Sequence, residues 1–312
     1  MNVNGHSSRP PSLRRRAALS VLGFLVVAGA LGFELAGRRG QFTAALNAAP
    51  VWLLAIAVLL QIIALLARTE AWHVCVLAAG GTVSRRLLYR AAGVGYLASV
   101  LNGSLGLAAR IASLRRVAPG TTPRIPALLT AEVPIISVEV ALTAIFSFTL
   151  VAPLGLPWWV PLIAVAVTGT AVFGLRRFSQ RHRLGLWAGL AAMHSGRGRM
   201  VALVLVAVCA QIARNWLVLR AIGVHVSVFD AMALLIAMFT LGQLPIGPSL
   251  GAAAAVLILG SHGVAATAAA GVMLTVTGTV GSLVYATWAV TDRMFAGRLA
   301  VSPEVAVAPT RA

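Results

Sequence analysis

Two glutamates and two arginines lie within long apolar stretches, where a charged side chain is costly. Glu132 and Glu139 are seven residues apart in the apolar run 126–152, so they share one face of the predicted helix. A charge near the middle of a membrane helix costs about 2.5–3.5 kcal/mol on insertion scales and most often serves a function. We expect Glu139 to line a cavity and to pair with Arg110 or Arg214, the alternative being a neutral glutamic acid bonded to a neighbouring helix. Glu132, closer to the helix start, is expected either on that face or at the membrane interface.

Arg110 follows a helix-breaking segment, Asn102-Gly-Ser-Leu-Gly106, by four residues. The planar guanidinium fork of arginine suits a phosphate, and a lipid headgroup supplies one. Arg110 is therefore expected either to hold a phosphate in a cavity or to extend its side chain to the cytoplasmic surface. Asn102, Ser104 and Gly106 of the break are candidate neighbours of that phosphate.

A second polar step consists of Gln211, Arg214 and Asn215, near the predicted outer end of the apolar run 200–219. Arginine side chains near the end of a membrane helix commonly reach the interface, so we expect Arg214 to extend outward. Gln211 and Asn215 are expected to form hydrogen bonds between helices.

The stretch Leu241–Val256 is apolar, yet it carries two prolines and two glycines within seven positions. These residues predict a broken helix. Exposed backbone polar groups cost several kcal/mol each in hydrocarbon, so a break at membrane depth must be buried in protein or line a cavity. Broken helices of this kind form the binding sites of many transporters. Pro245, Ser249 and Gly251 are therefore candidate site residues.

The composition is that of a polytopic membrane protein built from α-helices. Of the 312 residues, 59% are hydrophobic and 10% are charged, whereas soluble domains have about 25% charged residues. The formal net charge is +18, and every basic residue is an arginine. Cytoplasmic loops of membrane proteins collect arginine next to anionic lipids, and this interpretation is favoured over nucleic-acid binding.

The apolar runs predict six full membrane spans and two broken regions. Each run is close to the ~20 residues needed to cross the hydrocarbon core. The predicted spans are 17–36, 50–67, 126–152, 157–175, 200–219 and 268–291, and the broken regions are 87–116 and 228–262. Residues 1–16 are expected to be a disordered cytoplasmic tail, 17–298 one transmembrane domain, and 299–312 a C-terminal tail.

Arginine placement predicts the orientation, because arginine concentrates in cytoplasmic loops. With the N-terminus inside, Arg68 and the arginines of 85–90 are cytoplasmic. The six arginines of 176–199 are also cytoplasmic only if 87–116 is a re-entrant hairpin, and Arg293 and Arg298 are cytoplasmic only if 228–262 is one as well. The first hairpin then enters from the cytoplasm and the second from outside, and both termini are cytoplasmic.

The two broken regions resemble each other. Ser104-Leu-Gly-Leu-Ala-Ala109 aligns with Ser249-Leu-Gly-Ala-Ala-Ala254, 145 positions later. Each segment is expected to open a helix after a break. Because the two hairpins are predicted to enter from opposite sides, the sequence indicates an inverted repeat, a common plan of transporters.

These segments also carry a family resemblance. Three segments resemble motifs of the transmembrane, flippase-type domain of lysylphosphatidylglycerol synthases. They are Arg68-Thr-Glu-Ala-Trp72, then Gly95-Tyr96 with Leu105-Gly106 and Arg110, and then Leu244-Pro245 with Leu250-Gly251. The resemblance covers most of residues 17–291. It implies translocation of a lipid or a polyprenyl-linked glycolipid, or an accessory role beside such enzymes.

The chain departs from the family pattern where the family has charges. Leu107 and Ala254 stand where the two family motifs have glutamates. Asn102 and Ser104 stand where the first motif has a proline and a basic residue. The sequence after the last predicted helix is too short for the soluble aminoacyl-transferase domain, so lysyl transfer is not expected.

Enzymatic activity is not expected. The sequence has no phosphate-binding loop, no nucleophile elbow and only seven acidic residues, which leaves little for general acid–base chemistry. Glu70 and His73 lie one turn apart without a third metal ligand, so no metal or other cofactor is expected. The leading prediction is a flippase-like protein of the cell membrane that binds anionic lipids. The alternative is a non-catalytic partner of a cell-envelope lipid or glycan enzyme.

Two predictions concern packing. Trp72, Trp158, Trp159 and Trp187 lie at predicted helix ends and are expected to be interfacial anchors. The glycines of 271–281 are expected to allow close helix packing.

Overall fold

A computed structural model describes Gly29 and residues 37–101, 103–181, 188–190, 192, 196–241 and 250–300. The predicted first span, apart from Gly29, lies outside these residues. The same holds for the predicted tail 1–16 and for the C-terminal residues 301–312. In the described part of the chain, all regular secondary structure is helical, which confirms the predicted all-α class.

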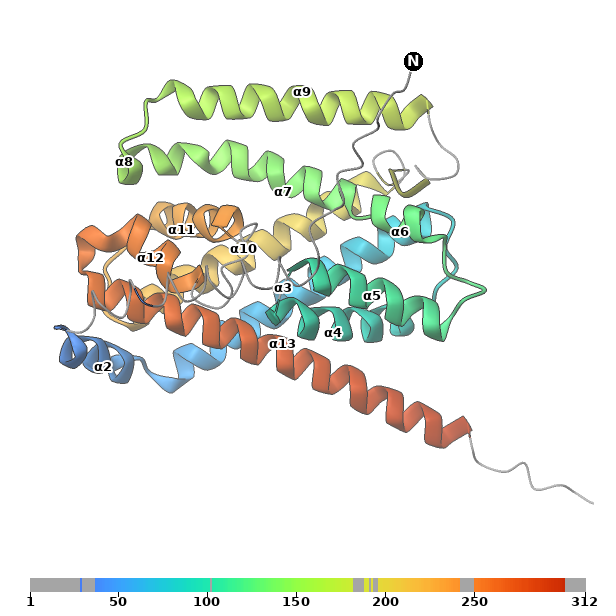
Figure 1. Ribbon diagram of the computed structural model, residues 1–312, viewed down its shortest axis with the longest axis horizontal. Helices are drawn as coiled ribbons and strands as arrows, with labels where there is room; N and C mark the ends of the chain where they lie inside the picture. The colour runs from blue at the N-terminus through green and yellow to red at the C-terminus, as the bar shows by residue number, and fades with distance from the viewer. Residues whose placement is uncertain are drawn as a thin grey trace, which may run out of the picture.

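The described helices occupy most of the chain (Figure 1). In order they are α2 (Arg39–Ala48), α3 (Val51–Ala78), α4 (Arg85–Leu101), α5 (Gly103–Val117), α6 (Ile125–Thr130), α7 (Val133–Phe146), η1 (Ser147–Leu150), α8 (Val151–Leu154), α9 (Trp159–Arg181), α10 (Arg197–Ala221), α11 (Val228–Leu241), α12 (Leu250–Leu259), η4 (Gly260–His262) and α13 (Val264–Ala300).

Five helical segments of the described chain are long and apolar enough to cross a membrane. They are Val51–Ala78, Ile125–Leu154, Trp159–Gln180, Arg197–Ala221 and Val264–Asp292. These segments coincide with five of the six predicted spans, and the remaining one is 17–36. The chain is therefore a multi-pass membrane protein by the length and composition of its helices.

The centre of the bundle is the packing of α3 against α10. Small side chains line this contact: Ala64 and Ala67 on α3 meet Ala207 and Ala210 on α10. Small residues let helices approach closely in a membrane, where apolar burial alone gives little driving force. Helix α13 packs along α3, and α7 lies on the other side of the bundle with α9 outside it (Figure 1).

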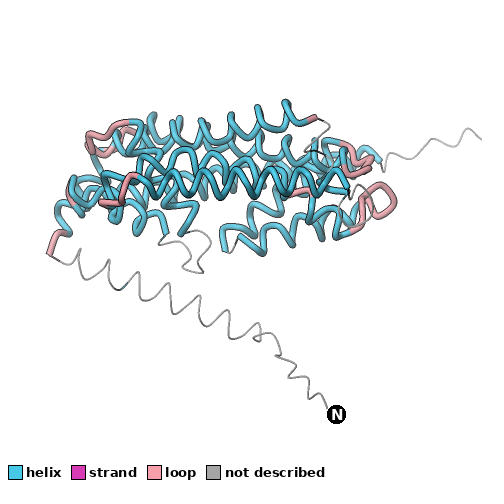
Figure 2. The backbone as a smooth tube through the Cα atoms, turned by 90° about the horizontal axis from the view of Figure 1, so that it is seen from above, coloured by secondary structure: helices cyan, strands magenta, loops and turns pink. Residues whose placement is uncertain are grey.

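Two pairs of short helices flank this centre from opposite ends. The pair α4–α5 lies at one end of the long axis and α11–α12 at the other (Figure 1), and the connecting loops gather at both ends (Figure 2). Within the first pair, a Cβ added to Gly106 would lie 2.7 Å from Ser99 Cβ, so glycine permits the close contact. At about 1.5 Å per residue these helices measure roughly 15–26 Å, which is less than the ~30 Å hydrocarbon core.

The base of the first pair is tied to the ends of three long helices. Glu70 of α3 accepts hydrogen bonds from Arg85 at 2.8 Å and from Arg199 of α10 at 2.6 Å. Asp292 of α13 forms ion pairs with Arg86 and Arg90 of α4. These four arginines, which are predicted to share one side of the membrane, thus lie together at one end of the molecule.

Candidate functional site

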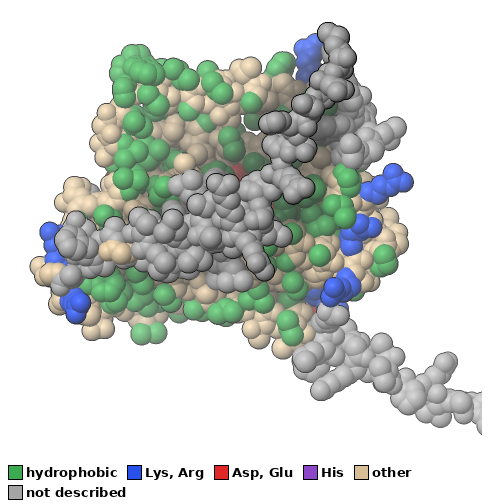
Figure 3. Space-filling model, viewed as in Figure 1, with side chains coloured by type: hydrophobic (Ala, Val, Ile, Leu, Met, Phe, Trp, Pro, Cys, Tyr) green, Lys and Arg blue, Asp and Glu red, His purple; other side chains and the backbone are tan. Residues whose placement is uncertain are grey.

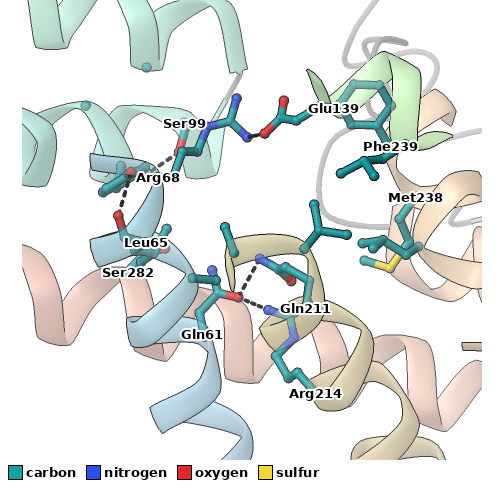
Figure 4. A pocket seen from close by; sticks show the side chains of 18 of the residues that line it. Gln61, Leu65, Arg68, Ser99, Glu139, Gln211, Arg214, Met238, Phe239 and Ser282 are labelled. Atoms are coloured by element: carbon teal, nitrogen blue, oxygen red, sulfur yellow. Dashed lines mark hydrogen bonds and ion pairs between the residues drawn. The ribbon is translucent and has the colours of Figure 1, made fainter. Parts of the chain in front are cut away.

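Helices α4 and α5, helix α11 and the long helices line a cavity of about 520 Å³. The tip of α4–α5 contributes Ser99, Gly106 and Leu107, and the tip of α11 contributes Met238 and Phe239. Helices α3, α7 and α10 complete the wall (Figure 4). Two segments far apart in sequence, the tip of α4–α5 and the C-terminal part of α11, therefore meet at one site.

The cavity has a polar side and an apolar side. The polar lining residues include Gln61, Arg68, Arg110, Glu132, Glu139, Gln211 and Arg214. The apolar lining residues include Leu142, Phe146, Leu235, Ile236, Met238 and Phe239. Figure 3 shows acidic atoms recessed between hydrophobic side chains on one face of the molecule. The cavity can thus receive a molecule that is itself half polar and half apolar.

Four charged side chains form a neutral cluster on the polar side, which we call the Arg68 cluster. Arg68 pairs with Glu139 at 2.6 Å and with Glu132 at 3.6 Å. Arg110 donates to Glu132 at 2.6 Å. The expected pairing of Glu139 with Arg110 or Arg214 is wrong, because Arg68 reaches Glu139 from α3. Glu132 is buried rather than interfacial.

Arg110 is held from two sides. Its guanidinium lies 4.0 Å from the ring centre of Trp72, and Glu132 accepts its hydrogen bond. Trp72 is fully buried beneath it, so the prediction of Trp72 as an interfacial anchor is wrong. Arg110 lines the cavity and does not extend to the cytoplasmic surface. Its Nη2 is bonded to Glu132, whereas its buried Nε has no hydrogen-bond partner among the described residues.

Arg214 forms a second cluster, which we call the Arg214 cluster. Its Nη1 donates to Gln61 Oε1, and its Nη2 donates to Asn215 Oδ1 at 3.5 Å. Gln211 also donates to Gln61, at 3.3 Å, and this bond joins α10 to α3 as predicted. Arg214 is only 5% exposed and turns into the cavity (Figure 4). The prediction that it extends outward is therefore wrong.

Glycines of α13 back the Arg214 cluster. A Cβ added to Gly281 would lie 2.6 Å from Gln61 Cγ, and one added to Gly278 would lie 3.3 Å from Arg214 Nη1. The side chains of Gln61 and Arg214 fit against α13 only because the helix carries no side chain at these two glycines. The predicted role of these glycines in close packing is confirmed.

The remaining predicted site residues fall in different places. Gly251 packs against α13, since an added Cβ would lie 2.5 Å from the Gly271 carbonyl oxygen. Ser104 lies in the first turn of α5. Asn102, Pro245 and Ser249 lie outside the described residues.

Sequence reasoning placed Arg68 at the cytoplasmic end of its helix and so missed its role in the cavity. The predicted span ends at residue 67, directly before the charge of Arg68. In the structure, α3 continues ten residues beyond Arg68, to Ala78. The apolar residues after Trp72 could have shown this continuation. Gln61 was missed because a single glutamine in a long apolar run carries no pattern of its own.

No protein-family model matches the chain, and no curated protein or solved structure matches it either. The function must therefore be inferred from the geometry of the cavity itself.

Proposed function

We propose that the chain is a flippase-like protein that moves a lipid or a polyprenyl-linked glycolipid across the membrane. The observation that carries this proposal is the cavity between the tip of the α4–α5 pair and the tip of α11, lined by both charged and apolar side chains. In this proposal the protein has the same kind of activity as the flippase-type domains that its motifs resemble.

The short helices support a re-entrant arrangement. None of the four is long enough to cross the hydrocarbon core, and the two pairs lie at opposite ends of the bundle (Figure 1). Hairpins that enter from opposite sides, together with the Ser104–Ala109 and Ser249–Ala254 match, form the inverted repeat. The arginine-rich end faces the cytoplasm in this arrangement, and both termini lie on that side.

The two sides of the cavity match the two parts of a lipid. Its volume is in the range of small-ligand sites, about 300–1,000 Å³, which suffices for a polar headgroup. Hydrogen-bonding side chains of α3 and α10 face the headgroup, while Leu142, Phe146 and Phe239 contact the start of the acyl or prenyl chain. Helix α9 packs on α7 and does not line the cavity. In this proposal the remainder of the acyl or prenyl chain extends from the cavity into the bilayer.

The Arg68 cluster lies on the route of the headgroup. Its charges are paired internally, so the cavity does not present an isolated charge to an empty bilayer centre. A passing headgroup must exchange contacts with Arg68 or Glu139. Glu139→Gln is therefore expected to slow translocation without removing the side-chain volume.

The test is a lipid-flip assay in proteoliposomes. Full-length protein is reconstituted into vesicles that contain fluorescent phosphatidylglycerol, and the fluorophore of the outer leaflet is quenched chemically. We expect faster loss of the protected signal than in empty vesicles, with Glu139→Gln slower than the wild type. Arg220→Gln, on the exposed face of α10, is the matched control. Wild-type protein that moves lipid no faster than empty vesicles would contradict the proposal.

A further inference from the structure

We propose that Arg214, with Gln61 and Gln211, forms a binding site for a phosphate or phosphodiester anion. The site lies in the half of the cavity away from the arginine-rich end. It rests on the proposed function in that the anion is taken to be the headgroup phosphate of a lipid.

The charge balance of the cavity is the first argument. Arg68 and Arg110 face Glu132 and Glu139, so that cluster is neutral. Within the described residues, no carboxylate lies within ion-pair distance of Arg214, whose described polar partners are Gln61 and Asn215. A buried charge without a counter-charge is costly, and an anion from outside would remove that cost.

Free hydrogen-bonding capacity is the second argument. Arg214 Nε is buried and has no hydrogen-bond partner in the part of the chain that the structure describes. Gln61 Oε1 already accepts from Arg214 and Gln211, which leaves amide N–H groups of both glutamines as donors. All three side chains line the cavity (Figure 4). A guanidinium fork flanked by amide donors suits the oxygens of a phosphate.

The internal repeat is the third argument. Ala64-x-x-Ala67-Arg68 on α3 aligns with Ala210-x-x-Ala213-Arg214 on α10, 146 positions later, close to the spacing of the two serine-led segments. Arg68 lies about 5 Å beyond the middle of α3, toward the arginine-rich end, at 1.5 Å per residue. Arg214 lies about 8 Å beyond the middle of α10, toward the opposite end. The repeat thus places equivalent cations in opposite halves of the cavity.

Among the described residues, a carboxylate pairs with Arg68 and none pairs with Arg214. Glu139 lies 2.6 Å from Arg68, whereas the described partners of Arg214, Gln61 and Asn215, are neutral. A ligand anion at Arg214 would complete the same pairing that Glu139 makes with Arg68. The simplest alternative is that Arg214 only joins α10 to α3 through Gln61, and the two roles differ in measurable ways.

The test is a binding measurement on full-length protein in a neutral detergent. The probes are short-chain phosphatidylglycerol, the matching diacylglycerol without phosphate, and inorganic phosphate. We expect Arg214→Gln to weaken phosphatidylglycerol binding at least about tenfold, as for loss of a charge-assisted hydrogen bond. Arg220→Gln on the same helix should bind like the wild type, and diacylglycerol should bind all proteins weakly and equally.

A second variant keeps the test decisive if Arg214→Gln does not fold. Gln61→Glu places a carboxylate beside Arg214 and reproduces the pairing of the Arg68 cluster. This variant should fold and should also lose phosphatidylglycerol binding at least about tenfold, because its own carboxylate neutralises the site.

The outcomes are distinct. If inorganic phosphate competes for the site as strongly as phosphatidylglycerol does, the result would support the anion site and identify a soluble anion as its ligand. Unchanged phosphatidylglycerol binding by Arg214→Gln or by Gln61→Glu would overturn the site, and a lowered melting temperature would then assign Arg214 to helix packing. Because binding is measured without transport, a failed flip assay overturns the proposed function but not an Arg214-dependent anion site.

Discussion

The Arg68 cluster and the Arg214 cluster place the same kind of side chain in two different environments. Arg68 lies between two glutamates, whereas Arg214 lies among amide groups. Both arginines line one cavity. The difference shows that two cations in one cavity need not have the same kind of partner: Arg68 is paired with carboxylates, whereas the described partners of Arg214 are neutral amides.

Breaking the Arg68 cluster should have the largest effect on stability. Glu132→Ala removes the carboxylate shared by Arg110 and Arg68, and it leaves Arg110 buried without a counter-charge. Breaking one partner of a buried pair costs about 3–5 kcal/mol. Chemical unfolding of the protein in detergent measures this loss, with Arg220→Gln as the control. A loss below about 1 kcal/mol would mean that the cluster is not a tight ion pair.

A smaller effect is expected from crowding the Arg214 cluster. Gly281→Ala adds a Cβ that would lie 2.6 Å from Gln61 Cγ, so Gln61 or α13 must shift. Overpacking of this kind costs about 1–3 kcal/mol. The control is Gly169→Ala on α9, where an added Cβ meets nothing within 4 Å. Equal unfolding midpoints for the two variants would show that α13 does not press on Gln61.

The smallest effect on stability should come from removing the unpaired cation. Arg214→Gln breaks no ion pair among the described residues and relieves a desolvated charge. We therefore expect an unfolding midpoint without lipid equal to or above that of the wild type. A midpoint that falls as far as that of Glu132→Ala would erase the distinction between the two clusters.

The sequence predicted the helical architecture well because the length of apolar runs and the positions of helix-breaking residues are local signals. Five spans and the approximate limits of both short helix pairs follow from them. Side-chain partners did not follow, since they depend on how each helix is rotated about its axis. Arg68 and Arg214 are both assigned to helix ends because they lie at or near the ends of the apolar runs 50–67 and 200–219. In the structure, α3 continues past Arg68, and α10 turns Arg214 toward α3.

The cavity holds its positive charge on guanidinium groups alone, which has a consequence for experiments in which pH is varied. Arginine stays protonated at any pH the protein is expected to survive. The other titratable groups in the cavity lining are Glu132, Glu139 and Tyr96. A change in lipid binding between mildly acidic and neutral pH would therefore report proton uptake by one of the two glutamates or by the ligand. Repeating the titration with Glu139→Gln would show whether Glu139 is the source, because the pH dependence would then disappear.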